Sequence, residues 1–292
     1  MQTFSARFAL TRSRFARGVV ALSLCAAFGA AAAPPKQGNA AGELIVVCSP
    51  GSPGSTDEAR PTLDAFAAAA SAKSGVALTA VYDPSDSGGA ARLASAGIGI
   101  VTLPFFLEHE RDLGLHARLD VVRKGRPDIE PWVLVAQKAR VANGASLAGF
   151  TIASNAAFAP AFVRGAVHEL GALPANVELK QVTAVLSWLR RAADGEPVAV
   201  LLDGQDAAAV ASLPFASKLE VVAHSPAMPA AVVVTTKHVT EQAWPQIAAG
   251  LVALASEPTA AAVLDGLQIA RFTPVDDAAL SAARDAYAKG SR

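Results

Sequence analysis

The chain has 292 residues, of which 52% are hydrophobic, and its 25 basic side chains balance its 25 acidic ones. This length is enough for one large or two small domains with a sizeable buried core. Arg7, Arg12, Arg14 and Arg17 lie within the first 17 positions, which leaves 21 basic against 25 acidic residues in the rest of the chain. Because nucleic-acid binding needs clustered Lys and Arg, this mildly acidic balance argues against a nucleic-acid partner.

The first 33 residues predict a secretory signal peptide. The four arginines precede an apolar run over residues 18–28, and residues 29–33 are all small. This succession is typical of a cleavable signal, and the run is shorter than the roughly 20 residues that a membrane span needs. We therefore expect a signal peptide over residues 1–33 and a linker over residues 34–43.

The two cysteines have different expected fates. Cys25 lies within the signal and follows Leu24, which is larger than the small residue that lipoprotein sites prefer, so no lipid anchor is expected there. Cys48 is then the single cysteine of the mature chain and cannot form an intrachain disulfide. Its place between a strand and a helix could lower the pKa of its thiol, but a small buried hydrophobic residue is the more common role.

The stretch from residue 44 to residue 56 predicts an anion site. Five apolar residues at 44–48 form a short buried strand, and a loop rich in Ser, Gly and Pro follows. Asp57 then leads into an Ala-rich helix that ends before Gly75. The free N–H groups and the positive end of a helix dipole would face the loop, which carries the hydroxyls of Ser49, Ser52, Ser55 and Thr56.

Strands and helices alternate along the rest of the chain, which predicts parallel sheets with right-handed crossovers. A first series has strands at 76–82, 98–103, 119–122 and 132–137 and a short helix at 90–96. A second series starts after residues 140–148. Its strands are expected at 150–153, 177–182, 198–202, 219–223 and 230–236, and its helices at 160–170, 184–193, 240–258, 259–267 and 278–289.

Polar side chains follow several of these strands. Thr102 lies at the end of one, Ser154 and Asn155 follow another, and Asp203 and Asp206 follow a third. Ligands of open α/β sheets bind outside the carboxyl ends of the strands, where hydroxyls and N–H groups can hold an oxyanion without a full positive charge. Each position taken singly is more often a turn or a cap. Together they would face one another across a cleft between two lobes.

The sequence does not contain the motifs required for nucleotide hydrolysis, nucleophilic catalysis or metal binding. Gly54, Ser55 and Thr56 are not accompanied by the Lys of a phosphate-binding P-loop, and the Gly-x-Ser-x-Gly nucleophile motif is absent. The five histidines are scattered without metal-ligand spacing. We therefore expect no catalytic residue, no metal and no cofactor.

Several stretches resemble one family, the phosphate/phosphite/phosphonate-binding branch of the periplasmic solute-binding proteins that serve ABC transporters. Residues 50–78 resemble its first loop and helix, and residues 93–106 its Gly-x-Asp-Ile-Ala strand with the Pro that follows. Residues 204–210, GQDAAAV, resemble its Gly-x-x-Asp-Ala-Ala segment. Residues 223–234 resemble its Ser-Pro-x-Ile-Pro return crossing, and residues 271–287 its Gly-Phe-x-Pro-Val-Asp tail. The resemblance covers nearly the whole mature chain.

The resemblance implies an α/β fold of the two-lobed type II periplasmic class, each lobe a mostly parallel sheet flanked by helices. Lobe 1 would comprise residues 44–138 and 226–292, and lobe 2 residues 139–225. It also implies a periplasmic protein, acting as a single copy, that holds a small anion between its lobes and delivers it to the membrane subunits of an ABC transporter. The expected ligand-binding residues are Ser49, Ser52, Ser55, Thr56, Thr102, Phe105, Trp132, Ser154, Asn155 and Asp206.

The chain departs from the family pattern at two places, and both concern the ligand-binding loops rather than the fold. Family members carry a Ser-Thr-Ser-Gly type of loop where this chain has Ser154–Asn155–Ala156–Ala157–Phe158, so one hydroxyl remains and Phe158 replaces a glycine. Binders of aminoalkyl phosphonates tend to have an acid where this chain has Ala230–Ala231. A cleft with fewer polar groups favours a smaller, less charged or more apolar ligand.

Two alternatives stay open. The same fold could serve as a sensor or accessory protein with a less polar ligand, as the altered second loop suggests. An enzyme that uses Cys48 or the scattered carboxylates would need a nucleophile–base pair, and the sequence offers none that can be named.

Overall fold

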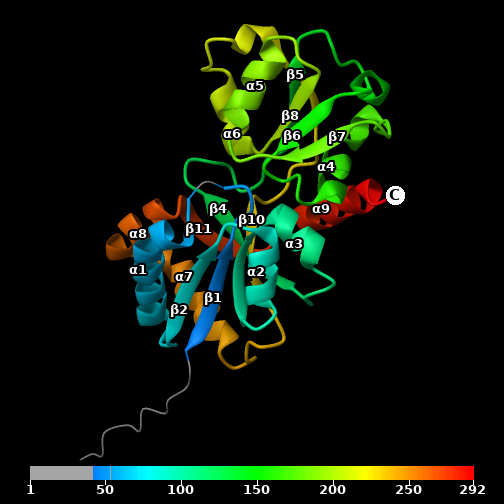
Figure 1. Ribbon diagram of the computed structural model, residues 1–292. Coiled ribbons are helices and arrows are strands. Elements are labelled where there is room, and N and C mark those ends of the chain that lie inside the picture. Colours follow the sequence, from blue (N-terminus) through cyan, green and yellow to red (C-terminus); the bar gives the residue numbers. More distant parts are fainter. Residues whose placement is uncertain (1–41, 53) are drawn as a thin grey trace, which may run out of the picture. The chain divides into compact units, whose positions relative to one another are not determined.

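The computed structural model describes residues 42–52 and 54–292. The predicted signal peptide, Cys25 and most of the predicted linker lie outside the described residues. Within them the chain forms two β-sheets flanked by helices (Figure 1), as the alternating pattern predicts.

The first sheet has six strands in the order β11-β4-β10-β3-β1-β2. β1 pairs in parallel with β2 and β3, whereas β10 runs antiparallel to β3 and β4, and β11 antiparallel to β4. The sheet is therefore mixed rather than mostly parallel. Its strands are β1 (Glu43–Cys48), β2 (Leu78–Asp83), β3 (Ile98–Thr102), β4 (His116–Arg123), β10 (Ala231–Thr235) and β11 (Ile269–Pro274).

The second sheet has five strands in the order β7-β6-β8-β5-β9. β6 pairs in parallel with β7 and β8, and β5 runs antiparallel to β8 and β9. Its strands are β5 (Val133–Gln137), β6 (Thr151–Ser154), β7 (Glu178–Gln181), β8 (Val198–Leu202) and β9 (Leu219–His224).

The placement of β5 corrects the predicted lobe boundary. Residues 133–137 were expected in lobe 1, yet β5 pairs on both sides with strands of the second sheet. Four of its five residues are buried there. The first crossing between the sheets thus precedes residue 133, because a strand belongs to the sheet that supplies its partners, whatever its position along the chain.

Nine α-helices complete the described part of the chain. They are α1 (Thr56–Ser74), α2 (Asp86–Leu93), α3 (Leu103–His109), α4 (Pro160–Ala166), α5 (Val185–Ala193), α6 (Gly204–Val210), α7 (Trp244–Ala253), α8 (Ala261–Gly266) and α9 (Asp277–Gly290). Single 3₁₀ turns occupy Gly144–Leu147, His168–Leu170, Ala216–Lys218, Leu254–Ser256 and Pro258–Ala260.

Several helix predictions need correction. α3 and α6 were not expected, and α2 begins at Asp86 instead of residue 90 because the Ser85 side chain caps the backbone N–H of Gly88. The helix expected over residues 160–170 ends as α4 at Ala166 and continues as a 3₁₀ turn. Such short helices depend on caps and packing more than on a periodic apolar face.

Helix α9 follows the first sheet in the chain but packs on α4 of the second (Figure 1). Glycines allow the contact. A Cβ atom on Gly165 of α4 would stand 2.1 Å from the carbonyl oxygen of Ala286, and one on Gly290 would stand 1.9 Å from that of Ala161. The close approach requires Gly at both positions.

Buried apolar side chains form three clusters. The largest combines both sheets and includes Phe105, Phe106, Trp132 and Phe162. The other two lie against one sheet each. Among the described residues no single helix is long and apolar enough to cross a membrane. The helical segments Trp244–Ser256 and Pro258–Gly266 are long and apolar enough only when taken together, and the chain bends by 87° at the break between them.

Candidate functional site

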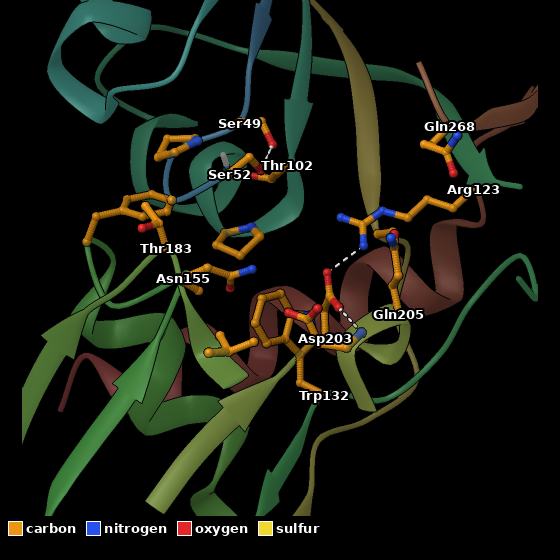
Figure 2. Close-up of a pocket in the computed structure, with 18 of the residues that line it drawn as sticks. Ser49, Ser52, Thr102, Arg123, Trp132, Asn155, Thr183, Asp203, Gln205 and Gln268 are labelled. Atoms are coloured by element: carbon orange, nitrogen blue, oxygen red, sulfur yellow. Dashed lines mark hydrogen bonds and ion pairs between the residues drawn. The ribbon is translucent and has the colours of Figure 1, made fainter. Parts of the chain in front are cut away.

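A cavity of about 390 Å³ lies among the loops at the strand ends of the two sheets (Figure 2). Its walls come from the loops after β1, β3, β6, β7 and β8, from the end of β4 and from the loop before β11. The lining residues include Ser49, Gly51, Ser52, Thr102, Pro104, Arg123, Trp132, Asn155, Phe158, Thr183, Asp203, Gln205, Asp206, Ala230, Leu267 and Gln268.

The loop after β1 presents two of its predicted serines to this cavity. The Ser49 and Ser52 hydroxyl oxygens are 2.7 Å apart, and the Ser52 N–H donates to the Ser49 carbonyl at 3.1 Å. Gly51 between them has φ +79° and lies against Asn155 from the second sheet. Because one hydroxyl of the pair donates to the other, one hydroxyl proton remains for a ligand.

Ser55 and Thr56 do not line the cavity. The Ser55 side chain accepts from the backbone N–H of Glu58 at 3.3 Å, while the Glu58 carboxylate accepts from the Ser55 N–H at 2.8 Å, which is a capping box at the start of α1. The Thr56 hydroxyl donates to the Tyr82 carbonyl at 3.1 Å. Both polar groups stabilise the helix start and are not available to a ligand.

Thr102 and Trp132 line the cavity, whereas Phe105 does not. The Thr102 Oγ1 is buried and has no hydrogen-bond partner in the described structure. Trp132 packs edge-on against Phe162 with ring centroids 5.0 Å apart. Phe105 is fully buried in α3, so the unpredicted helix removes it from the site.

The loop after β6 contributes Asn155 but not Ser154. Ser154 is fully buried, and its hydroxyl accepts from the N–H of Ala156 at 3.1 Å. Asn155 lines the cavity, and its Oδ1 is a second buried atom without a partner in the described structure. Thr183, after β7, adds a hydroxyl that partly replaces those the loop lacks.

The charged groups gather at one end of the cavity, at the carboxyl ends of β4 and β8 (Figure 2). Arg123 Nη1 donates to Asp203 Oδ2 at 2.5 Å, and both side chains are largely buried. Asp203 also caps α6 by accepting from the Asp206 N–H at 2.9 Å. Burial, reinforced by Asp203 and opposed by Arg123, raises the pKa of Asp206 to about 6. The site thus pairs one cation with two carboxyl groups.

The prediction missed Arg123, Thr183, Gln205 and Gln268. Arg123 directly follows the predicted strand 119–122, so the rule that found Thr102 also applied to it. Gln205 lies in the first turn of the unpredicted α6. Gln268 has φ +55°, which is uncommon for a residue other than glycine, and no sequence pattern marks it.

Cys48 takes the structural role. Its thiol is buried and donates weakly to the Ser85 carbonyl at 3.5 Å. Burial, followed by the charges of Asp83 and Asp86, raises the pKa of this thiol far above its usual range. In the described part of the chain, no cluster of three or more His, Cys, Asp or Glu side chains could hold a metal ion.

Comparison with known proteins identifies a family. The model of the periplasmic substrate-binding protein of phosphonate ABC transporters matches residues 102–280. No curated protein sequence matches this chain as a close relative.

Solved structures show the same fold. A Xanthomonas citri protein bound to ATP has a TM-score of 0.67 at 14% identity, over 85% of this chain and 98% of that one. A binding protein component of an ABC phosphonate transporter from Pseudomonas aeruginosa has a TM-score of 0.61 at 14% identity, covering 86% and 87%. PhnD1 from Prochlorococcus marinus in complex with methylphosphonate has a TM-score of 0.58 at 11% identity, covering 85% and 98%. These likenesses show the predicted two-lobed type II periplasmic binding fold.

Proposed function

The chain belongs to the family of periplasmic substrate-binding proteins of phosphonate ABC transporters, and from this membership we propose that it binds a small phosphonate or phosphate-like monoanion in the cavity between its two sheets. Members of this class bind a solute for a membrane transporter and do not transform it. What we propose is the identity of the ligand and of the residues that bind it.

The observation that carries the proposal is that two of the three buried side-chain atoms without partners in the described structure, Thr102 Oγ1 and Asn155 Oδ1, belong to residues that line the cavity; the third, Asp120 Oδ1, lies elsewhere. A buried polar atom without a hydrogen bond costs about 1–3 kcal/mol, so both atoms favour a polar ligand. The Thr102 hydroxyl can donate to a negatively charged oxygen, and the Asn155 carbonyl can accept from a protonated one. A singly protonated phosphonate offers both kinds of oxygen.

The charge balance supports a monoanion rather than a dianion. Arg123 carries five N–H donors and uses one for Asp203, so the others can reach a ligand oxygen. The two acidic side chains, Asp203 and Asp206, oppose a second negative charge on the ligand. Ser49, Ser52 and Thr183 supply neutral hydroxyls around the same space.

The experiment is a titration of the purified mature protein by isothermal calorimetry, with Trp132 fluorescence as a second readout because this side chain lines the cavity. Phosphate, phosphite and methylphosphonate are expected to bind, and sulfate, which has no proton to give Asn155, is expected to bind at least tenfold more weakly. Absence of binding by all three phosphorus anions would overturn the proposed ligand.

The delivery role is a second part of the proposal. We place the mature chain in the periplasm as a single copy that presents its ligand to the membrane subunits of an ABC transporter. Size-exclusion chromatography with light scattering tests the single copy. Co-purification with the permease of a phosphonate ABC transporter from the same organism, in the presence and absence of methylphosphonate, tests delivery; failure of the permease to bind the loaded protein would favour a sensor instead.

A further inference from the structure

A second, smaller cavity of about 120 Å³ adjoins the anion site, and we call it the annex. Its apolar wall includes Val47, Ile100, Val121, Ala231, Leu267 and Ile269. These residues come from five strands of the first sheet and from the loop before β11. The annex therefore lies at the end of that sheet from which the ligand loops depart.

Strand register places the wall residues side by side. Val47 of β1 is paired with Ile100 of β3, and Ala231 of β10 is paired with Val121 of β4. Ala231 is the smallest of them, and it lies between larger neighbours at the first position of its strand. A longer side chain at residue 231 would fill the space that the annex leaves.

The annex and the anion site share part of their walls. Ser49, Thr102 and Arg123, which present the polar groups of the main cavity, also border the annex. Leu267 and Gln268 border both as well. A ligand whose anionic group contacts Ser49, Thr102 and Arg123 can therefore direct its substituent into the annex.

The annex is also continuous with the core. Ile100, Val121 and Ile269 belong to the buried cluster on the α1 and α8 side of the first sheet. A gap at the edge of a core is one explanation of such a space. Its position beside the anion site, with shared polar residues at its border, favours a ligand instead, because apolar subsites next to a few placed polar groups are the usual composition of small-molecule sites.

We propose that the annex is a subsite for the apolar substituent of the ligand, so that the protein prefers phosphonates with a short alkyl chain over phosphate and methylphosphonate. This inference rests on the proposed function. At roughly 30 Å³ for each water-sized group, the annex holds about four carbon atoms. Each methylene group buried there should tighten binding by about fourfold, the equivalent of about 0.8 kcal/mol.

The test is a calorimetric series with methyl-, ethyl-, propyl-, butyl- and hexylphosphonate. The dissociation constant should fall by about fourfold per carbon up to butyl and should stop falling at hexyl. Ala231→Leu should lower the affinity for butylphosphonate at least tenfold more than that for methylphosphonate. Val47→Ala, which enlarges the annex, should move the optimum to a longer chain.

The matched control is Ala249→Leu, the same change on an exposed position of α7, which should leave the whole series unaltered. Equal affinities across the series, with methylphosphonate bound, would overturn the annex and leave the anion site standing. Absence of binding by every phosphonate and by phosphate would overturn both. If Ala231→Leu does not fold, the Val47→Ala series and the wild-type chain-length profile decide the question.

Discussion

Gly51 on the loop after β1 lies directly against Asn155 on the loop after β6, so close that a Cβ atom on Gly51 would stand 2.4 Å from the Asn155 carbonyl oxygen. Gly51 also has φ +79°, which residues with a side chain rarely adopt. The contact joins the two predicted halves of the site. It keeps the hydroxyls of Ser49 and Ser52 within one cavity with the Asn155 amide.

Gly51→Ala is expected to weaken methylphosphonate binding by at least tenfold, because the added Cβ forces the two loops apart. Gly75→Ala is the control, since Gly75 has a similar φ of +71° but no atom within 4 Å of its Cβ position. Both variants should lose about 1–2 kcal/mol of folding stability from backbone strain, measured by urea unfolding. Equal binding by the two variants would contradict the role of the contact.

Thr102→Val is expected to reduce methylphosphonate affinity by about tenfold without lowering stability. The change removes a buried hydroxyl that has no partner in the described structure, so folding loses no hydrogen bond. Thr236→Val is the converse control. Its hydroxyl donates to the Ala96 carbonyl at 2.6 Å, so its removal should cost about 1–2 kcal/mol of stability and leave binding unchanged. Calorimetry and thermal unfolding of both variants separate the two effects.

Arg123 and Asp203 should have opposite effects on anion binding. Arg123→Gln removes the one cation among the described lining residues and should weaken binding at least tenfold. Asp203→Asn keeps a side-chain oxygen to cap α6 but removes the charge that competes with the ligand, so binding should tighten by several-fold. Arg271→Gln, which breaks an exposed pair with Asp128, should change neither affinity nor stability appreciably. Weaker binding by Asp203→Asn would indicate that Asp203 contacts the ligand.

Asp206→Asn should stabilise the protein at pH 8 by about 1–2 kcal/mol, less than the full pKa shift implies because solvent screens the partly exposed carboxyl group, and it should have little effect near pH 4. Burial raises the pKa of Asp206 from 3.8 to about 6, so the folded protein holds this proton more tightly than the unfolded chain. The ionised carboxylate therefore destabilises the fold in full above about pH 6, and the cost disappears as the pH falls toward 4. Urea unfolding at both pH values measures the difference. An equal shift at both would point to packing rather than to the charge.

Cys48 is expected to resist thiol reagents in the folded protein at pH 8. The thiol is buried, its raised pKa disfavours the reactive thiolate, and Gly89 packs against it so closely that a Cβ atom there would stand 2.1 Å from the sulfur. Labelling with an aromatic disulfide should proceed only when urea unfolds the chain. Rapid labelling of the native protein would reopen the enzyme alternative.

The local pattern of the sequence determined much of the fold. Apolar runs bounded by Gly, Pro and Ser located ten of the eleven strands of the described chain to within a few residues. Five residues that the strand-end rule singled out line the cavity, namely Ser49, Ser52, Thr102, Asn155 and Asp206, and their contact with a ligand stays a prediction. The eleventh strand, β11, was not predicted, because residues 271–277 were expected only to connect to the last helix. These signals are local because alternation and turn residues depend on neighbours in the chain.

Only the tertiary structure decided which strands pair and which polar groups remain free. The pairing of β5 with the second sheet could not be predicted from local pattern, because its partners β8 and β9 are more than 60 residues away along the chain. Ser55, Thr56 and Ser154 carry the same hydroxyl as Thr102, yet the first three find partners in the protein and Thr102 finds none. A hydroxyl becomes available to a ligand through the absence of a neighbour, and neighbours in space follow from packing rather than from composition.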